Sequence, residues 1–261
     1  MMRALYTAAT GMAASQLQID TVSNNLANVS TLAFKKSRAE FEDLMYQTLN
    51  VAGTQNEGGQ TLPTGLQVGM GSRTTTVHKF FTQGDFQNTG NQLDVAISGQ
   101  GFFKLQDPQG NDVYTRAGSF TLNQSGNVVS ANGYPLQPAF TVPQNAANIV
   151  ITEQGVISAT DAQGNVLTST TIPLYLFQNP AGLTSLGGNN YQVSDASGAA
   201  QELNPGTQNA GTMVQGFLEM SNVSMVDEMV SLIVGQRAYE ANSKSISTAD
   251  SMLQTATNLK R

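Results

Sequence analysis

The sequence of 261 residues has no cysteine, no tryptophan and a single histidine. Without cysteine the chain cannot form disulfides, bind a metal through thiolates or use a cysteine nucleophile. His78 is the only histidine, so a histidine-based metal site or a catalytic pair with a second histidine is excluded. We interpret His78 as an ordinary strand residue.

Charge is scarce: Lys, Arg, Asp and Glu make up 11% of the chain and give a net charge of −6, against about 25% charged residues in a typical soluble domain. An acidic balance argues against nucleic acid or an anionic membrane as a partner. No stretch is long and apolar enough to span a bilayer, so we expect no membrane insertion. A surface with few charges and many amides is poorly protected against self-association, which suits a polymer.

Motifs that carry chemistry are also missing. The glycine-containing stretches 69–73 and 98–104 each include a cation but lack the spacing of a phosphate-binding loop. The carboxylates mostly stand at predicted turns. Glycoside hydrolysis requires two carboxylates that folding brings close together. The sequence leaves this possibility open but contains no motif that favours it. We therefore expect no enzyme, no catalytic residues, no cofactor and no metal.

The C-terminal stretch carries apolar residues every seven positions, namely Met225, Leu232, Tyr239, Ile246 and Leu253. This spacing places them in one line along a helix. Val223, Val226, Met229, Val230 and Ile233 widen the line near its start. Ser224 with Asp227 three residues later has the spacing of a capping box. The pattern predicts a helix from Met225 to Leu259, roughly 50 Å long at 1.5 Å per residue, which needs a partner.

The N-terminal stretch repeats the seven-residue spacing at Leu5, Met12, Ile19 and Leu26, with a second line three places later at Ala8, Ser15, Val22 and Val29. Two such lines at opposite ends of the chain predict an antiparallel or coiled-coil pair of helices. Two separate amphipathic helices packed on a globular core are the alternative. We favour the pair, because neither end has much else to pack against.

The middle of the chain is rich in turn-forming residues, and all eight prolines lie between Pro63 and Pro205. This distribution favours short strands joined by turns over long helices. Three stretches share one turn formula, in which Asp or Asn is followed by Gly three residues later: 107–111, 123–127 and 161–165. This formula is typical of hairpin turns. It predicts a meander, a sandwich or a small, partly closed barrel. We expect irregular loops over 182–211, one more strand over 212–220, and a short helix around Phe41, Leu44 and Met45.

The predicted fold class is therefore α+β, with paired terminal helices and an inserted all-β, hairpin-rich domain. We expect a helical domain of residues 1–33 and 222–261 and a β-rich outer domain of residues 81–211. Between them we expect a connector of residues 34–80 and 212–221, which carries a long extended arm over 46–65.

Two long motifs resemble a known family. Residues 24–49, NNLANVSTLAFKKSRAEFEDLMYQTL, and residues 236–253, QRAYEANSKSISTADSML, closely resemble the N- and C-terminal motifs of the bacterial flagellar rod and hook family. Residues 94–105, DVAISGQGFFKL, fit the same family. The matching motif positions are Asn24, Asn25, Asn28, Phe34, Lys35, Gln236, Arg237, Tyr239 and Asn242. The FEDLMYQT and LPTGLQVGMGSR stretches, at this overall length, look most like the distal rod members of that family.

The resemblance implies a non-enzymatic axial protein that polymerises helically into a hollow, rigid shaft of the basal body. Its expected partners are other copies of itself, proximal rod and hook subunits at the ends of the shaft, the P- and L-ring bushings and the flagellar type III export apparatus. The shaft would span the periplasm to the outer membrane, and the terminal helices would line its central channel. Because the N-terminus lacks the pattern of a signal peptide, we expect export without a cleaved signal.

The resemblance also implies a role for the arm, whose distinguishing residues are Tyr46, Leu62, Pro63 and Gly65: we expect it to bridge neighbouring subunits and stiffen the tube. The chain departs from the family pattern at Ala33, where glycine is usual and would suit a positive-φ turn after the helix.

Two alternatives remain at this point. Within the family, the chain could be a hook or proximal rod protein. From another class, it could be a secreted carbohydrate-binding β domain with helical oligomerising ends. That reading predicts an exposed aromatic platform, for which Phe102 and Phe103 are the candidates, although their strand context favours at least one of them as core.

Overall fold

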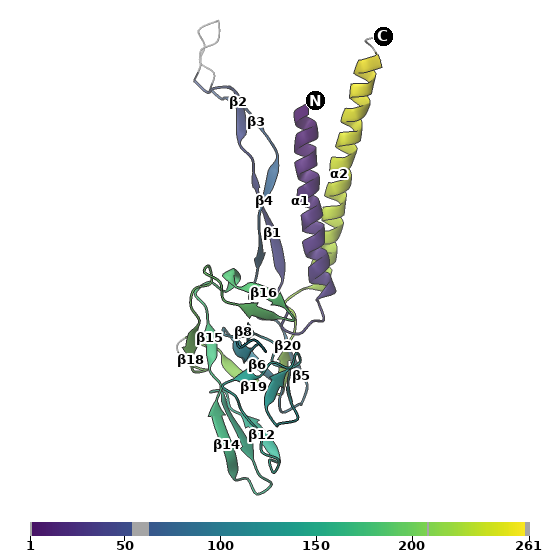
Figure 1. Cartoon of the computed structure of the whole chain (residues 1–261). Coiled ribbons are helices and arrows are strands. Elements are labelled where there is room, and N and C mark those ends of the chain that lie inside the picture. The colour runs from purple at the N-terminus through teal and green to yellow at the C-terminus, as the bar shows by residue number, and fades with distance from the viewer. Residues whose placement is uncertain (1, 54–62, 208, 259–261) are drawn as a thin grey trace. The chain divides into compact units, whose positions relative to one another are not determined.

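The structure is a computed structural model that describes residues 2–53, 63–207 and 209–258 (Figure 1). The chain forms two compact units. Unit 1 contains residues 1–27, 37–78 and 224–261, and unit 2 contains residues 28–36 and 79–223. The residues that we predicted as a connector, 34–80 and 212–221, are divided between the two units.

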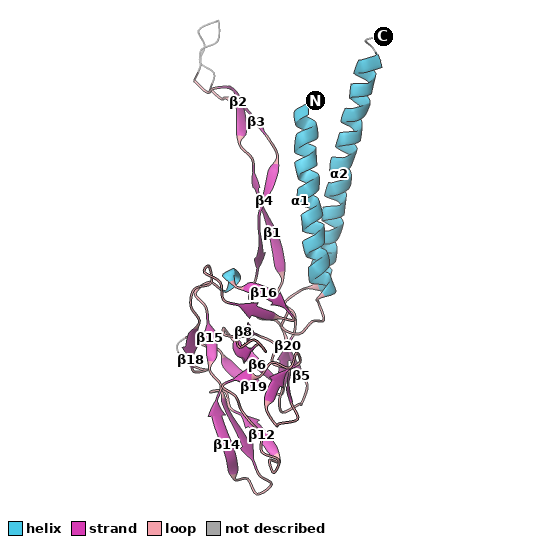
Figure 2. Ribbon diagram, viewed as in Figure 1, coloured by secondary structure: helices cyan, strands magenta, loops and turns pink. Residues whose placement is uncertain are grey.

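Two long helices, α1 (Met2–Ala27) and α2 (Met225–Asn258), form an antiparallel pair in unit 1. The register is visible at three levels: Gly11 lies beside Asn242, Gly235 lies beside Ile19, and Asn25 contacts Glu228. The prediction of paired terminal helices is confirmed (Figure 2). The predicted start of α2 is also confirmed, because the Asp227 amide donates to the Ser224 hydroxyl at 3.5 Å, as expected of a capping residue. The predicted end at Leu259 lies outside the described residues.

Unit 1 also contains two short antiparallel ladders. β1 (Ser37–Asp43) pairs with β4 (Ser72–Lys79), and β2 (Tyr46–Asn50) pairs with β3 (Leu66–Gly69). The expected short helix around Phe41 is therefore wrong. Along β1 half-buried and exposed side chains alternate on either side of Ala39 and Glu40, which are both half-buried, and the facing strand β4 is rich in β-branched residues. Cross-strand pairing with that segment outweighs the weak helical spacing of three apolar residues.

Unit 2 is built from short strands. Its largest sheet is antiparallel, in the order β11-β7-β8-β17-β16, and a second sheet has the order β12-β13-β14. The other ladders of this unit are the pairs β9–β10, β15–β18, β6–β19 and β5–β20. The strands are β5 (Phe86–Asn88), β6 (Val95–Ser98), β7 (Phe103–Gln106), β8 (Asp112–Thr115), β9 (Phe120–Leu122), β10 (Val128–Ser130), β11 (Leu136–Gln137), β12 (Asn148–Ile151), β13 (Val156–Thr160), β14 (Val166–Thr171), β15 (Leu174–Leu176), β16 (Thr184–Gly187), β17 (Asn190–Gln192), β18 (Gln201–Leu203), β19 (Thr212–Gln215) and β20 (Phe217–Glu219), with a short 3₁₀ helix, η1 (Pro180–Gly182).

The repeated turn formula forms hairpin turns, as predicted. In each copy the glycine amide donates to the carbonyl of the opening Asp or Asn: Gly110 to Asp107, Gly126 to Asn123 and Gly164 to Asp161, at 2.8–2.9 Å. All three glycines have positive φ, between 77° and 86°, which costs glycine little. The turns connect β7 to β8, β9 to β10 and β13 to β14.

Two groups of buried side chains form the core of unit 2. One contains Ile97, Phe103, Leu105, Phe120 and Leu174, among others. The other is aromatic and contains Phe102, Tyr114, Tyr175, Phe177 and Tyr191. Phe102 and Phe103 are 3% and 0% exposed, so they are core residues and not an exposed platform for sugars.

Residues 182–211 are more regular than we expected, and the prediction of irregular loops is wrong in part. They contain β16, β17 and β18. Tyr191 on β17 pairs with Tyr114 on β8 and is buried. Each strand offers only one or two apolar residues, so the local pattern is weak, and pairing with a strand remote in the sequence decides the structure.

The final predicted strand is present but divided. β19 pairs with β6, and β20 pairs with β5. Gly216, with φ of 78°, separates the two.

Ala33 adopts the positive-φ conformation that glycine would favour. Its φ is 54°, its side chain is 1% exposed, and its amide donates to the Glu219 carbonyl at 2.8 Å. The backbone shape at this position is therefore kept with alanine, at the cost of the steric strain that a Cβ brings to this region.

We predict that Ala33→Gly raises the free energy of unfolding by about 1 kcal/mol, because it removes the αL strain of alanine. Gly198→Ala provides the matched control. Gly198 has φ of 74° and open space where a Cβ would stand, so this change should lower stability by a similar amount. Urea unfolding followed by circular dichroism measures both changes. A loss of stability in Ala33→Gly would contradict the assigned strain.

Candidate functional site

The contact line between α1 and α2 is made largely of small residues. On α1 the residues most deeply buried at seven-residue spacing are Ala8, Ser15 and Val22, and on α2 they are Glu228, Gly235 and Ala249. A Cβ on Gly235 would stand 3.1 Å from Cγ1 of Ile19. The two helices thus approach closely at this level, and a larger residue at position 235 would push them apart.

The residues that we predicted as the interface flank this line. Leu5, Met12, Ile19 and Leu26 on α1 are half-buried, as are Leu232, Ile246 and Leu253 on α2. Met225 and Tyr239 are exposed. The most buried line on α2 is shifted by three residues from the predicted one, because Gly235 and Ala249 permit the close approach that bulkier residues would prevent.

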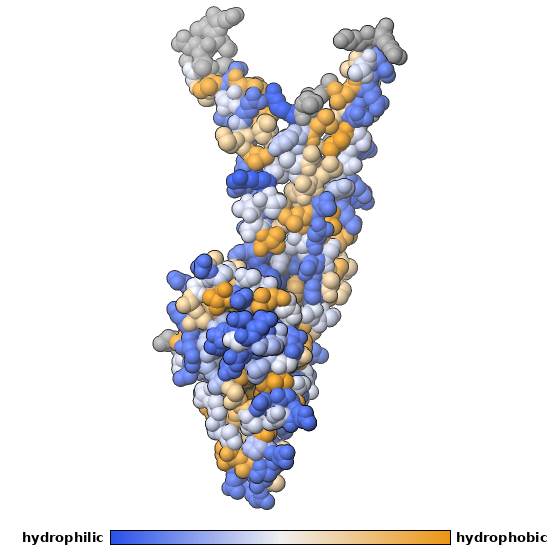
Figure 3. Space-filling view, in the orientation of Figure 1, coloured by the Kyte–Doolittle hydropathy of each residue, from blue (hydrophilic) through white to orange (hydrophobic). Residues whose placement is uncertain are grey.

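The first half of α2 carries an apolar surface that faces solvent. Its members are Met225, Val226, Met229, Val230, Ile233 and Val234, each 44–65% exposed. At 100° per residue, Val226, Val230 and Ile233 stand roughly opposite Glu228, which is buried. Figure 3 shows apolar residues on the exposed surface of the helix pair. We call these six residues the α2 apolar face.

Asn25 of the N-terminal motif holds α1 to two other segments of unit 1. Its side-chain amide donates to the Ser37 carbonyl at 2.8 Å and to the Glu228 carboxylate at 3.1 Å. Its carbonyl oxygen accepts from the Ser37 amide at 2.9 Å. Asn25 and Glu228 are each 1% exposed, so this amide ties β1 and α2 to the end of α1.

The other motif residues have varied settings. Asn28 accepts a hydrogen bond from the Thr31 hydroxyl at 3.1 Å, and Asn242 packs against Gly11 across the helix pair. Arg237 forms an exposed ion pair with Glu240 at 3.5 Å. Asn24, Gln236 and Tyr239 are exposed, and Phe34 is half-buried.

Lys35 belongs to a buried ionic cluster in unit 2. Its ammonium group lies 2.6 Å from Oε1 of Glu219 and donates to the Thr82 carbonyl at 2.7 Å. Arg116 pairs with Oε2 of the same carboxylate at 2.7 Å and donates to the Gly99 carbonyl at 2.6 Å. Lys35 and Glu219 have no exposed side-chain area. The sequence motif pointed to Lys35, but no local signal pointed to Arg116 or Glu219.

The two cations control the protonation of this carboxyl. Burial by itself would raise the pKa of Glu219, but the charges of Arg116 and Lys35 outweigh it and hold the pKa below its ordinary value. Burial, followed by repulsion from Arg116, lowers the pKa of Lys35.

The arm is an exposed hairpin within the described residues. All five residues of β2 are exposed, and Tyr46 packs its ring against Gly69. Pro63 and Gly65 are exposed, and a Cβ on Gly65 would stand 2.8 Å from the Asn50 carbonyl oxygen. Leu62 lies outside the described residues.

Within residues 2–53, 63–207 and 209–258, no group of three or more His, Cys, Asp or Glu side chains is arranged to hold a metal. The described helices also include none that is long and apolar enough to cross a membrane.

Comparison with known proteins identifies the family of this chain. Three family models match: a flagella basal body rod protein model at residues 5–35, a flagellar hook protein FlgE/F/G D1 domain model at 96–159, and a flagellar basal body rod FlgEFG protein C-terminal model at 214–259. Proteins named flagellar basal-body rod protein FlgG are similar over the full length. That of Buchnera aphidicola from Acyrthosiphon pisum is 47% identical, over 99% of this chain and 100% of the relative. Those of Borreliella burgdorferi and Bacillus subtilis are 46% and 39% identical, each over 100% of both chains.

The chain belongs to the flagellar basal-body rod family. The N-terminal model covers most of α1, together with Asn25, Ala33 and Lys35, and the C-terminal model covers α2 and the strand of Glu219. The central model covers strands of unit 2. A structural role in the rod of the flagellar basal body therefore follows, with other rod and hook subunits as neighbours.

We predict that Glu219→Gln lowers the free energy of unfolding by about 3 kcal/mol at pH 7, because it leaves two buried cations without their counter-charge. The folded-state pKa of Glu219 is depressed, so the stabilisation is present above its unfolded value and is lost as pH falls through the folded pKa. The difference between the two proteins should therefore shrink in acid. Urea titrations at several pH values, followed by tyrosine circular dichroism, measure it.

Glu153→Gln, at an exposed position, is the control and should change stability by less than about 0.5 kcal/mol. An equal loss in both variants, or a difference that does not depend on pH, would rule out the assigned role of the Glu219 charge.

Proposed function

We propose that this chain is the distal rod subunit of the bacterial flagellum, a non-enzymatic protein that polymerises helically into a rigid, hollow drive shaft. The shaft would transmit torque from the motor to the hook and would contain the channel through which later subunits are exported. Full-length similarity to FlgG rod proteins supports this proposal.

The observation that carries polymerisation is the α2 apolar face. It gathers six large apolar side chains on one half of one helix, and none of the six is buried by α1. Moving a side chain of this kind fully out of water contributes roughly 1.5–3 kcal/mol. A monomer would leave this free energy unused, whereas a second copy of the chain that packs its own helices there would recover it.

The wider partners follow from the proposed position in the flagellum. At its ends the shaft would contact proximal rod and hook subunits, and along its side it would contact the P- and L-ring bushings. The subunits would reach the tip through the type III export apparatus without a cleaved signal and would span the periplasm to the outer membrane. The terminal helices would line the channel, and unit 2 would contribute to the outer wall.

A hook or proximal rod protein remains the alternative within the family. The arm favours the distal rod, because a stiff hairpin that reaches a neighbouring subunit would oppose bending. Its exposed apolar residues, among them Tyr46, Leu49 and Val51 at 46–61% exposure, support contact with another subunit.

We expect Val230→Asp combined with Val234→Asp to abolish polymerisation of concentrated protein, since a buried charge in the subunit interface is strongly unfavourable. Both positions are more than half exposed in the single chain, so the fold of the monomer should not change. Sedimentation and negative-stain microscopy report polymerisation, and circular dichroism reports the fold.

The matched control places the same charges elsewhere on α2, as Ser243→Asp with Ser247→Asp. Both of these serines are exposed and polar. Normal tubes from the Val230/Val234 variant, or equal failure of both variants, would remove the α2 apolar face from the interface.

The arm can be shortened without disturbing the ladder below it. The Leu44 amide donates to the Gly71 carbonyl at 2.9 Å, so β1 and β4 stay joined if residues 46–69 are replaced by the two-residue turn Asn-Gly. We expect this variant to polymerise into curved or flexible tubes, whereas the full chain forms straight ones. Straight tubes from the shortened chain, seen by electron microscopy, would argue against a stiffening arm.

A further inference from the structure

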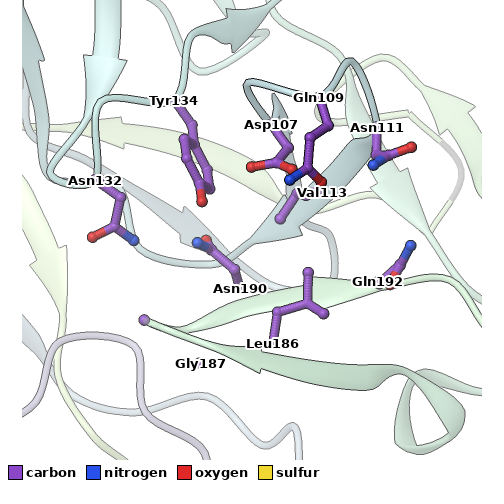
Figure 4. Close-up of a pocket in the computed structure, with 11 residues that line it drawn as sticks. Asp107, Gln109, Asn111, Val113, Asn132, Tyr134, Leu186, Gly187, Asn190 and Gln192 are labelled. Atoms are coloured by element: carbon purple, nitrogen blue, oxygen red, sulfur yellow. The ribbon is translucent and has the colours of Figure 1, made fainter.

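A polar cavity of about 610 Å³ opens within unit 2. This volume falls within the roughly 300–1,000 Å³ typical of small-molecule sites. Three parts of the unit form its walls: the turn between β7 and β8, the turn between β10 and β11, and the β16–β17 hairpin (Figure 4). The role proposed for the subunit in a shaft does not use this cavity.

Asn190 on β17 is the buried polar group of the cavity. Its side chain is drawn pointing toward the space between Asp107, Asn132 and Tyr134 in Figure 4, and the residue is 6% exposed. Among the described residues, no hydrogen bond to its side-chain amide is found. By contrast, the amide of Asn25, which is 1% exposed, donates twice and accepts once within unit 1. The amide atoms of Asn190 are open to the solvent in the cavity, so a ligand that both donates and accepts would replace water on this side chain.

The remaining lining repeats the chemistry of Asn190. Four more amide side chains surround the space, from Gln109, Asn111, Asn132 and Gln192. Each amide offers donors and an acceptor side by side. Among the lining residues there is no lysine or arginine, and Asp107 supplies one carboxylate. A phosphate or carboxylate ligand would therefore meet a negative charge and no cation, which excludes the usual basis of anion recognition.

Tyr134 and Leu186 add apolar surface to this amide-rich lining. The tyrosine ring can pack against an apolar ring face while its hydroxyl stays polar. The neighbouring Asp107 carboxylate raises the pKa of the Tyr134 phenol through a hydrogen bond and through its charge.

We propose that this cavity is a binding site for a short neutral saccharide. Neighbouring hydroxyl groups of a sugar both donate and accept, which matches paired amides, and the C–H face of a sugar ring matches Tyr134 and Leu186. Asn190 and Gln109 make the central polar contacts from opposite walls. The site lies within one subunit, so it operates whether or not the subunits polymerise. A failure of either proposal leaves the other standing.

Nuclear magnetic resonance of the dilute, ¹⁵N-labelled full chain tests the proposal. The test ligands are maltotriose, which carries hydroxyls only, tri-N-acetylchitotriose, which also carries acetamido groups, and inorganic phosphate. We expect either or both trisaccharides to shift the amide signals of Gln109, Asn111 and Asn190 with a Kd of about 1 mM, which corresponds to about −4 kcal/mol. The preferred trisaccharide identifies the kind of sugar. Phosphate should shift none of these signals.

The repeated turn formula supplies a matched control. Gln109 and Gln163 occupy the same position in the turns 107–111 and 161–165, but only Gln109 lines the cavity. Gln109→Ala and Asn190→Ala should each weaken binding about fivefold or more, since each removes a polar contact. Gln163→Ala should leave binding unchanged. If Asn190→Ala does not fold, Gln109→Ala decides the test, because its turn is exposed.

Three outcomes would overturn the site: no shifts with either trisaccharide up to about 20 mM, far above the expected Kd; a response to phosphate as large as that to sugar; or equal weakening by Gln109→Ala and Gln163→Ala.

Discussion

A single buried carboxylate organises unit 2. Glu219 receives Lys35 on one oxygen and Arg116 on the other, and its backbone carbonyl receives the amide of Ala33. Burial of three charges is tolerated only because each charge has close partners and additional backbone acceptors. In the sequence, Lys35 follows α1 by a few residues and Glu219 precedes α2 by a few. The cluster therefore fixes the two points at which the chain enters and leaves the inserted β unit.

Unit 1 buries its apolar side chains less completely than unit 2 does. Its inner contact line uses alanine, serine and glycine to bring α1 and α2 close together, while many of its larger apolar side chains stay half-buried or fully exposed. A helix pair built like this keeps a surface for further helices. The incomplete burial of these apolar side chains agrees with the rod family to which the chain belongs, because a subunit of a polymer buries such side chains against neighbouring subunits.

Features with a strong local or periodic signal were predictable from the sequence: the two terminal helices, the cap at Ser224 and the three hairpin turns. Features that depend on contacts remote in the sequence were not. The seven-residue pattern suggested Met225 and Tyr239 as contacts, yet the helices meet three residues away, where Gly235 allows close approach. Phe41 stood in a weak helical pattern, but pairing of β1 with β4 made it part of a strand. Arg116 and Glu219 carry no motif of their own, and only the fold brings them to Lys35.

The antiparallel pairing of α1 and α2 also has a consequence for chain topology. The first turn of α1 and the last turns of α2 lie at the same end of the helix pair (Figure 1). The start of α1 therefore lies beside the C-terminal part of α2, and α2 extends a few residues beyond it. The same contacts would exist in a circularly permuted chain joined by a short linker at the helix ends and opened at an exposed hairpin turn such as 161–165.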